Sequence, residues 1–187
     1  MGACNTLYRD GEKICGENTD VIGFMAPLRK RSLSPETRVL VLGAGGVSRA
    51  AIAGLRRLGL ANITLTNRRK ERAEALCNEF GLLCAPWEER GDVPADLIIN
   101  TTPLGMTGAQ EHETPYPWAF QDNGIAYDLI YTPFQTRFLR DAAAAGWETV
   151  SGLDMFIGQG DAQFHLWTGH HLPEEAITAV TSALYGQ

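Results

Sequence analysis

The stretch RVLVLGAGGVSRAA, residues 38–51, constrains the fold of this chain more than any other segment. The apolar run VLVL is typical of a strand that is buried on both faces of a parallel sheet. A helical pattern follows from about residue 47 to 58. A strand that runs through glycines into a helix lets the backbone approach a pyrophosphate lying on the helix N-terminus. We therefore predict a dinucleotide site formed by Gly43, Ala44, Gly45, Gly46 and Val47.

This glycine turn is a variant of the G-x-G-x-x-G pattern, because Ser48 occupies the place of the last glycine. The small residues Ala50 and Ala51 can still allow the helix to pack closely on the strand. The alternative is a glycine-rich turn that binds no ligand, and the strand–turn–helix context argues against it.

Strand and helix patterns alternate after this turn. Strands are expected at 62–67, 96–100, 124–130 and near 148–150, and helices at 70–80, 135–146, 153–168 and 173–185. Such alternation predicts an α/β fold, a doubly wound parallel sheet of the Rossmann type with helices on both faces.

The end of the second strand indicates which nucleotide would bind. A site for NAD usually has Asp or Glu there, to bind the ribose 2′-hydroxyl. This chain has Asn67, Arg68 and Arg69, with Arg72 one helical turn later. The planar donors of arginine suit a 2′-phosphate, so we predict NADP. A solvated basic helix start is the alternative, although the helix dipole disfavours it.

The segment before the glycine turn reads as a separate unit. Residues 6–18 resemble a hairpin around the turn Asp10-Gly11, and a helix is expected at 20–31, followed by the polar break 32–37. We therefore divide the chain into 1–34, a remnant of another domain with a linker helix, 35–150, the nucleotide-binding domain, and 151–187, closing helices.

Motifs from one end of the chain to the other resemble the shikimate/quinate dehydrogenase family. GACNT (2–6) and GENTDVIGF (16–24) resemble its substrate-domain segments, and VLGAGGVSRA and TNRRKERA resemble its NADP-binding segments, although Arg69 replaces a common threonine. INTTPLGM (99–106), YDLIYTPFQTRFL (127–139) and GLDMFIGQGDAQFHLWTG (152–169) resemble its later segments.

The resemblance implies reversible hydride transfer between NADP and shikimate/3-dehydroshikimate or a close relative, a step of aromatic amino-acid biosynthesis. Asp20 matches the catalytic aspartate, and Asn5, Tyr131 and Gln159 match substrate contacts. The positions that match the surroundings of the nicotinamide are Asn100, Thr101, Thr102, Gly152 and Met155.

Each of these residues also has a simpler interpretation. Asp20 could be only a helix cap, Asn5 a turn residue and Gln159 a solvent-facing helix residue, while Met155 could be simple core. Shikimate and quinate are not distinguished by these residues, although an NADP site mildly favours shikimate.

The proton-transferring partner of Asp20 is the main gap. In the family that aspartate works with a lysine of the N-terminal substrate domain, and the three lysines here, Lys13, Lys30 and Lys70, do not match that motif. We expect the isolated chain to be impaired. An engineered deletion, a misassigned start and a natural truncation would each give such a chain. A non-catalytic NADP-binding module, an interaction fragment and a quinate/shikimate dehydrogenase-like paralogue remain alternatives.

Composition excludes several other functions. A net charge of −6 argues against a nucleic-acid or anionic-membrane surface, and no apolar run approaches 18 residues. The four cysteines have no C-x-x-C spacing and the four histidines suggest no metal site, so we expect reduced thiols, no metal and a cytoplasmic location. Apolar surface near residues 1–30 and on the last helices predicts a homo-oligomer.

Overall fold

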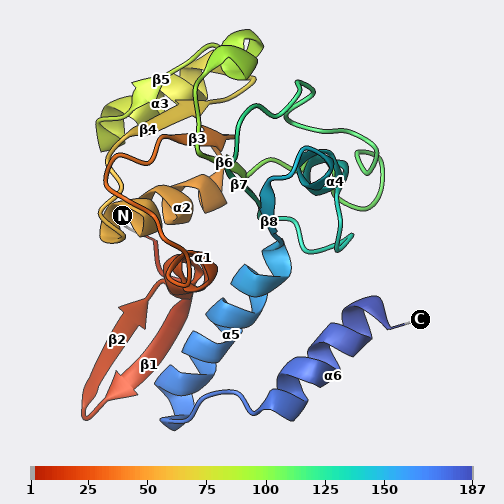
Figure 1. Ribbon diagram of the computed structural model, residues 1–187. Helices are drawn as coiled ribbons and strands as arrows, with labels where there is room; N and C mark the ends of the chain where they lie inside the picture. The colour runs from red at the N-terminus through yellow and green to blue at the C-terminus, as the bar shows by residue number, and fades with distance from the viewer. Residues whose placement is uncertain (1–2, 187) are drawn as a thin grey trace.

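The computed structural model describes residues 3–186 and contains two sheets. The larger is a six-stranded parallel sheet in the order β5-β4-β3-β6-β7-β8 (Figure 1). Its strands are β3 Val39–Leu42, β4 Ile63–Thr66, β5 Leu83–Cys84, β6 Leu97–Asn100, β7 Ile125–Asp128 and β8 Glu148–Val150. The order reverses between β3 and β6, the switch point at which open α/β sheets bind ligands. The predicted Rossmann-type sheet is confirmed.

The two faces of this sheet separate the core into two clusters. Val39, Val41 and Leu65 pack with one cluster, under helices α1 Thr19–Leu28, α2 Gly46–Arg57 and α3 Lys70–Phe80. Leu40 and Leu42 point to the opposite face and pack with α4 Arg137–Ala144 and the 116–120 segment. Side chains alternate between the faces of a strand, so the VLVL run supplies both clusters. Helices therefore cover both faces, as predicted.

The N-terminal residues form a separate antiparallel hairpin of β1 Thr6–Asp10 and β2 Lys13–Glu17. It continues into α1, which packs against the long helix α5 Gly152–Thr168. In Figure 1 the hairpin, α5 and the final helix α6 Glu174–Tyr185 extend together away from the larger sheet. The Phe24 ring stacks on Tyr127 at 5.2 Å, which joins α1 to β7.

Sequence patterns missed two short elements. The strand β5 has only two residues, both exposed, and the 3-10 helix η1 Trp87–Asp92 is polar. Neither has a hydrophobic period that would have predicted it. The other predicted elements lie within a few residues of the observed ones. For example, α4 begins at Arg137 because the Thr136 hydroxyl accepts a hydrogen bond from Leu139 N and caps the helix.

Across residues 3–186, each helix is too short or too polar to span a lipid bilayer.

Candidate functional site

Most of the predicted cofactor residues lie at the carboxyl edge of the larger sheet, and Gly152 and Met155 of α5 are the exceptions. Strands β3, β4 and β6 are adjacent and parallel, so the residues that follow them lie side by side. These residues are Gly43, Asn67 and Thr101. They line one pocket of about 190 Å³ together with Ala44, Gly45, Arg68, Arg69, Arg72, Trp87, Thr102, Pro103, Leu104 and Gln110.

Glycine is required at the first position of the turn. Gly43 has φ +115°, and a Cβ there would lie 2.5 Å from Thr101 Oγ1. At Gly45 and Gly46, in contrast, an added Cβ would meet nothing within 4 Å. The turn is therefore tightly packed toward β6 and open toward the pocket, as a turn that admits a ligand to its backbone should be.

Ser48 has a specific role at the position where the pattern expects glycine. Its buried hydroxyl accepts from Gly45 N at 2.9 Å and lies 2.7 Å from Thr101 Oγ1. Thr101 Oγ1 donates to Leu42 O at 2.8 Å, so Ser48 is the donor to Thr101. The serine therefore holds the glycine turn against the loop that follows β6.

Asn67 links the glycine turn to the arginines. Its Oδ1 accepts from Ala44 N at 3.2 Å, and its Nδ2 donates to Arg69 O at 2.8 Å. Arg68, Arg69 and Arg72 are exposed and line the same pocket. Positively charged side chains beside an open helix N-terminus attract anions, so an anion site here stays a prediction.

Trp87 is a pocket residue that the sequence analysis missed. It lines the glycine-turn pocket and a neighbouring pocket of about 240 Å³, and these pockets share Asn67, Arg68 and Trp87. The Arg90 guanidinium lies 3.7 Å from the Trp87 ring centroid and 4.5 Å from that of Trp118. The aromatic residue in the polar stretch CAPWEER was the available signal.

On the other side, the glycine-turn pocket adjoins a pocket of about 530 Å³ at Thr101, Thr102 and Pro103. We call this larger one the second pocket. Its walls are two loops: residues 101–107 after β6 and residues 129–132 after β7, with Val47 from α2 completing the lining. Thr107 N donates to Thr132 O at 3.0 Å and joins the two walls. The glycine-turn pocket and this second pocket together form one cleft, and the second pocket is the end that lies away from the arginines.

A buried polar network lies beneath these loops. Asn100 Nδ2 donates to Asp128 Oδ1 at 2.9 Å, and Asn100 Oδ1 accepts from Thr102 N at 2.9 Å and Thr102 Oγ1 at 2.7 Å. Asn100 and Asp128 are both fully buried. Burial raises the pKa of Asp128 to about 7, although hydrogen bonds from Thr136, Ile130 and Asn100 act in the opposite direction.

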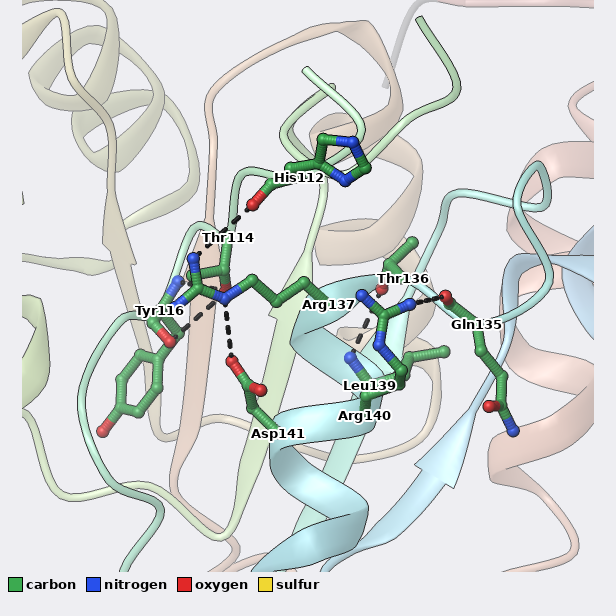
Figure 2. A network of polar contacts seen from close by, with 9 residues as sticks. All are labelled: His112, Thr114, Tyr116, Gln135, Thr136, Arg137, Leu139, Arg140 and Asp141. Atoms are coloured by element: carbon green, nitrogen blue, oxygen red, sulfur yellow. Dashed lines mark hydrogen bonds and ion pairs between the residues drawn. The ribbon is translucent and has the colours of Figure 1, made fainter.

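The start of α4 contacts the long segment between β6 and β7 and the residues just before the helix (Figure 2). Arg137 forms an ion pair with Asp141 at 3.4 Å, and its Nη1 donates to His112 O at 3.5 Å. Arg140 Nη1 donates to Gln135 O at 2.7 Å. These contacts connect α4 to the long loop before β7 and to the residues that precede the helix.

Asp20 and Asn5 form a hydrogen-bonded pair where the hairpin meets the start of α1, and neither lines the pockets at the sheet edge. Asn5 Nδ2 donates to Asp20 Oδ1 at 3.0 Å, and Asn5 Oδ1 accepts from Thr19 N at 2.9 Å. These hydrogen bonds therefore join the residue before β1 to the first turn of α1. Asn18 occupies the N-cap position of α1 without a side-chain capping bond, so Asp20 is not the cap. Among hydrogen bonds of residues 3–186, Asp20 Oδ2 has no protein partner.

Gln159 and Tyr131 reach this region from two different elements. Gln159 lies where α5 crosses α1, since a Cβ added at Gly23 would be 2.6 Å from Gln159 N, and its Nε2 donates to Phe156 O at 2.9 Å. Tyr131 lines the second pocket and stacks on Phe156 at 4.8 Å. Phe156 thus lies beside both residues, while no described hydrogen bond joins Gln159 or Tyr131 to Asp20.

Gly152 and Met155 lie behind the pocket wall. Gly152 N donates to Ile130 O at 3.1 Å, and a Cβ there would lie 2.5 Å from Leu129 O. Met155 is buried in the core cluster under α1. Neither lines the two pockets at the sheet edge, and their contact with a nicotinamide stays a prediction.

Within residues 3–186, no three His, Cys, Asp or Glu side chains lie close enough together to hold a metal ion.

Two family models match this chain. Residues 28–89 match "Shikimate / quinate 5-dehydrogenase", and residues 152–180 match "Shikimate 5'-dehydrogenase C-terminal domain". The first match contains the glycine turn and the arginines, and the second contains α5. The two models therefore cover separate parts of the candidate site.

Individual relatives agree with these matches. Shikimate dehydrogenase (NADP(+)) of Pelobacter propionicus is 56% identical over 98% of this chain and 68% of its own length. The structure of shikimate 5-dehydrogenase from Thermus thermophilus with NADP(H) and shikimate is similar at TM-score 0.83, with 37% identity over 98% of this chain and 69% of that one. Quinate dehydrogenase from Corynebacterium glutamicum with NAD gives TM-score 0.86, with 28% identity over 98% and 68%. The chain thus spans about two thirds of each.

Proposed function

This chain belongs to the shikimate/quinate dehydrogenase family, and we propose that it carries the NADP-binding part and one catalytic residue of an enzyme that interconverts shikimate and 3-dehydroshikimate. The observation that carries the proposal is the continuous pocket at the sheet edge. The glycine turn, the arginines after β4 and the loop after β6 line it together. One extended ligand can therefore contact all three.

The residues present fit NADP. Gly45 and Gly46 leave open space at the N-terminus of α2, where backbone N–H groups favour a pyrophosphate. Arg68, Arg69 and Arg72 stand where the 2′-phosphate of an adenosine ribose would need positive charge. The second pocket, which shares Thr101 and Thr102 with the first, would receive the nicotinamide end.

The same geometry favours NADP over NAD. In a Rossmann-type site for NAD a carboxylate binds the ribose 2′-hydroxyl. Here Asn67 occupies the end of β4, and its side chain is already used by Ala44 N and Arg69 O. The exposed arginines beside it have no comparable role in binding an uncharged hydroxyl.

Asp20 is the residue of this chain that we assign to proton transfer. When bound, NADP supplies a nicotinamide that accepts a hydride from the hydroxyl-bearing carbon. The hydroxyl proton must leave as well, and Asp20 Oδ2 is available for it because Oδ1 accepts from Asn5. Asn5, Tyr131 and Gln159 would bind ring hydroxyls and orient the substrate.

The test is calorimetric titration of the chain with NADP and with NAD. We expect clearly tighter binding of NADP, and equal affinity for both nucleotides would contradict the proposal. The substrate is then identified by comparing the turnover of shikimate and of quinate by an assembled enzyme that contains this chain. Faster turnover of quinate would favour a quinate/shikimate dehydrogenase-like paralogue.

Three coarser features also belong to the proposal. The division into 1–34, 35–150 and 151–187 predicts that limited proteolysis cuts first in the polar segment 32–37. A cytoplasmic location remains a prediction. Self-association is expected because Leu7 and Ile14 of the hairpin are 66% and 75% exposed. Sedimentation that shows a monomer at all micromolar concentrations would contradict it.

A further inference from the structure

Asp128 is a buried carboxylate for which the proposed chemistry has no use. It is the last residue of β7, is fully buried, and accepts three hydrogen bonds. Asn100 Nδ2 and Ile130 N donate to Oδ1 at 2.9 and 3.0 Å, and Thr136 Oγ1 donates to Oδ2 at 2.6 Å. Burying a carboxylate is costly, so these three partners point to a specific role.

The three partners attach to both walls of the second pocket, although only Ile130 lines it. Asn100 is the last residue of β6, directly before the loop 101–107, whereas Ile130 belongs to the facing loop 129–132, and Thr136 lies just before α4, a few residues after that loop. Asp128 does not itself line the pocket. A single side chain beneath the floor therefore connects the two walls.

Asp128 also determines which way the Asn100 amide points. Asp128 Oδ1 accepts from Ile130 N, and Asn100 presents Nδ2 to the same oxygen. That orientation leaves Asn100 Oδ1 to accept from Thr102 N and Thr102 Oγ1, and lets Nδ2 also donate to Leu104 O at 3.2 Å. If the amide were flipped, its oxygen would face the Asp128 oxygen, and its NH2 group would face the two donors of Thr102.

We propose that Asp128 is a positioning residue for the nicotinamide end of the cleft: it orients Asn100 and holds the loops 101–107 and 129–132 at the separation that accepts the nicotinamide. This inference rests on the proposed cofactor function. It assigns Asp128 no contact with the cofactor. Neither Asp128 nor its partners Asn100, Ile130 and Thr136 line the pocket of the arginines, so the effect should fall mainly on the nicotinamide end, and this difference makes it testable.

The experiment compares two ligands on the whole chain. NADPH occupies both ends of the cleft, whereas adenosine 2′,5′-bisphosphate can occupy only the arginine end. In Asp128→Ala, we expect NADPH to bind about tenfold more weakly, the effect of losing a buried hydrogen bond and leaving its donor without a partner. Affinity for the bisphosphate should change by less than about twofold, because the arginines that would bind it share no hydrogen-bond partner with Asp128. Asp128→Asn retains an acceptor for Asn100 and should recover most of the NADPH affinity.

A second pair of variants covers the case in which Asp128→Ala does not fold. Thr136→Ala removes the donor to Asp128 Oδ2, whereas Thr136→Ser retains it, and Thr136 lines neither pocket. We expect Thr136→Ala to weaken NADPH selectively and Thr136→Ser to match the parent.

Two results would overturn the inference: unchanged NADPH affinity in the Ala variants, or equal weakening of both ligands, which would mean that the network supports only the fold. Failure of the parent chain to bind either ligand would contradict the proposed function instead. These outcomes are distinguishable because the parent is titrated with both ligands first.

Discussion

The hydroxyl of Ser48 donates to Thr101 Oγ1 across 2.7 Å and joins the start of α2 to the end of β6. Thr101 in turn donates to Leu42 O of β3. This chain of bonds spans the switch point of the sheet, where the pyrophosphate is proposed to bind. At this position a hydrogen bond from serine therefore takes the place of the close packing that a third glycine would give.

Ser48→Ala should lower both stability and cofactor affinity. The variant leaves Gly45 N and Thr101 Oγ1 without their partner, at a position with no exposed side-chain surface. We expect a loss of about 1–2 kcal/mol in the free energy of unfolding and weaker NADPH binding. Urea unfolding and NADPH titration measure the two effects. Ser182→Ala, at an exposed site on α6, is the control, and an equally small effect at both serines would contradict this role.

Much of the fold followed from the sequence because its signals are local. The VLVL run, the glycines and the recurring helix patterns predicted the parallel sheet. Those patterns carried no information on which buried polar groups meet. Asn100 was assigned only through a family motif, and its partner Asp128 was overlooked, although a carboxylate in the apolar strand IAYDLI should have indicated a buried partner. Trp87 was missed because a pocket depends on tertiary contacts.

The pairing of Asp20 with Asn5 shows that motif matching can identify residues but does not predict their contacts. The two residues are 15 positions apart, and the match to family segments assigned them separately. The structure joins them with a 3.0 Å hydrogen bond. A sequence pattern alone could not supply this contact, because it depends on how the hairpin returns to the start of α1.

Arg68→Ala should reduce the preference for NADP. The guanidinium is exposed in the pocket beside Asn67 and is proposed to pair with the 2′-phosphate. Losing a charge-assisted hydrogen bond should weaken NADP by roughly tenfold to a hundredfold and leave NAD nearly unchanged. Calorimetry with both nucleotides measures the ratio. Arg57→Ala removes the same charge from an exposed site at the end of α2 and should keep the parent ratio, so a similar loss there would indicate only a general effect of charge.

The protonation of Asp128 should make the protein less stable as the pH rises. Burial raises the pKa of this carboxyl from 3.8 to about 7, so the folded state binds the proton more tightly than the unfolded state does. Its stabilisation is complete below about pH 4 and is lost as the pH rises to about 7, on the order of 4 kcal/mol in total. The amide introduced by Asp128→Asn cannot titrate, so the stability of that variant relative to the parent should rise across this window.

Urea unfolding of the parent and of Asp128→Asn between pH 4 and 8 measures that difference. Other carboxyl groups, such as Asp96, whose pKa Arg38 lowers through hydrogen bonds, titrate in both proteins and cancel. The groups that hydrogen-bond to Asp128 in the described structure are Asn100, Ile130 and Thr136, which are uncharged. A difference that stays constant from pH 4 to 8 would show that Asp128 titrates normally.

Arg90→Met should destabilise the fold without changing nucleotide preference. Arg90 lies against the rings of Trp87 and Trp118, and its Nε donates to Pro115 O at 2.6 Å. Methionine retains much of the apolar volume but loses the cation–π contacts and the hydrogen bonds, so we expect a loss of about 2 kcal/mol. Chemical denaturation checks it against Arg29→Met, an exposed control. Equal stability of both variants would show that the rings do not need the guanidinium.

The isolated 187-residue polypeptide should bind NADP but oxidise shikimate slowly. Lys13, Lys30 and Lys70 are all exposed and lie on β2, after α1 and at the start of α3; within the described structure Asp20 receives its hydrogen bond from Asn5 alone. Missing acid–base assistance costs typically about 10²–10⁴-fold in rate, and incomplete positioning of the substrate adds to the loss.

Fusion to the lysine-bearing N-terminal substrate domain of a family member should restore NADPH formation, followed by its absorbance, and Asp20→Asn should then abolish most of it. Glu36→Gln makes the same carboxylate-to-amide change at an exposed position in the polar segment before the sheet, and this matched control should not affect turnover. Rapid turnover by the polypeptide alone would mean that another group here performs the role of the lysine, and the assignment of Asp20 as half of a pair would then be wrong.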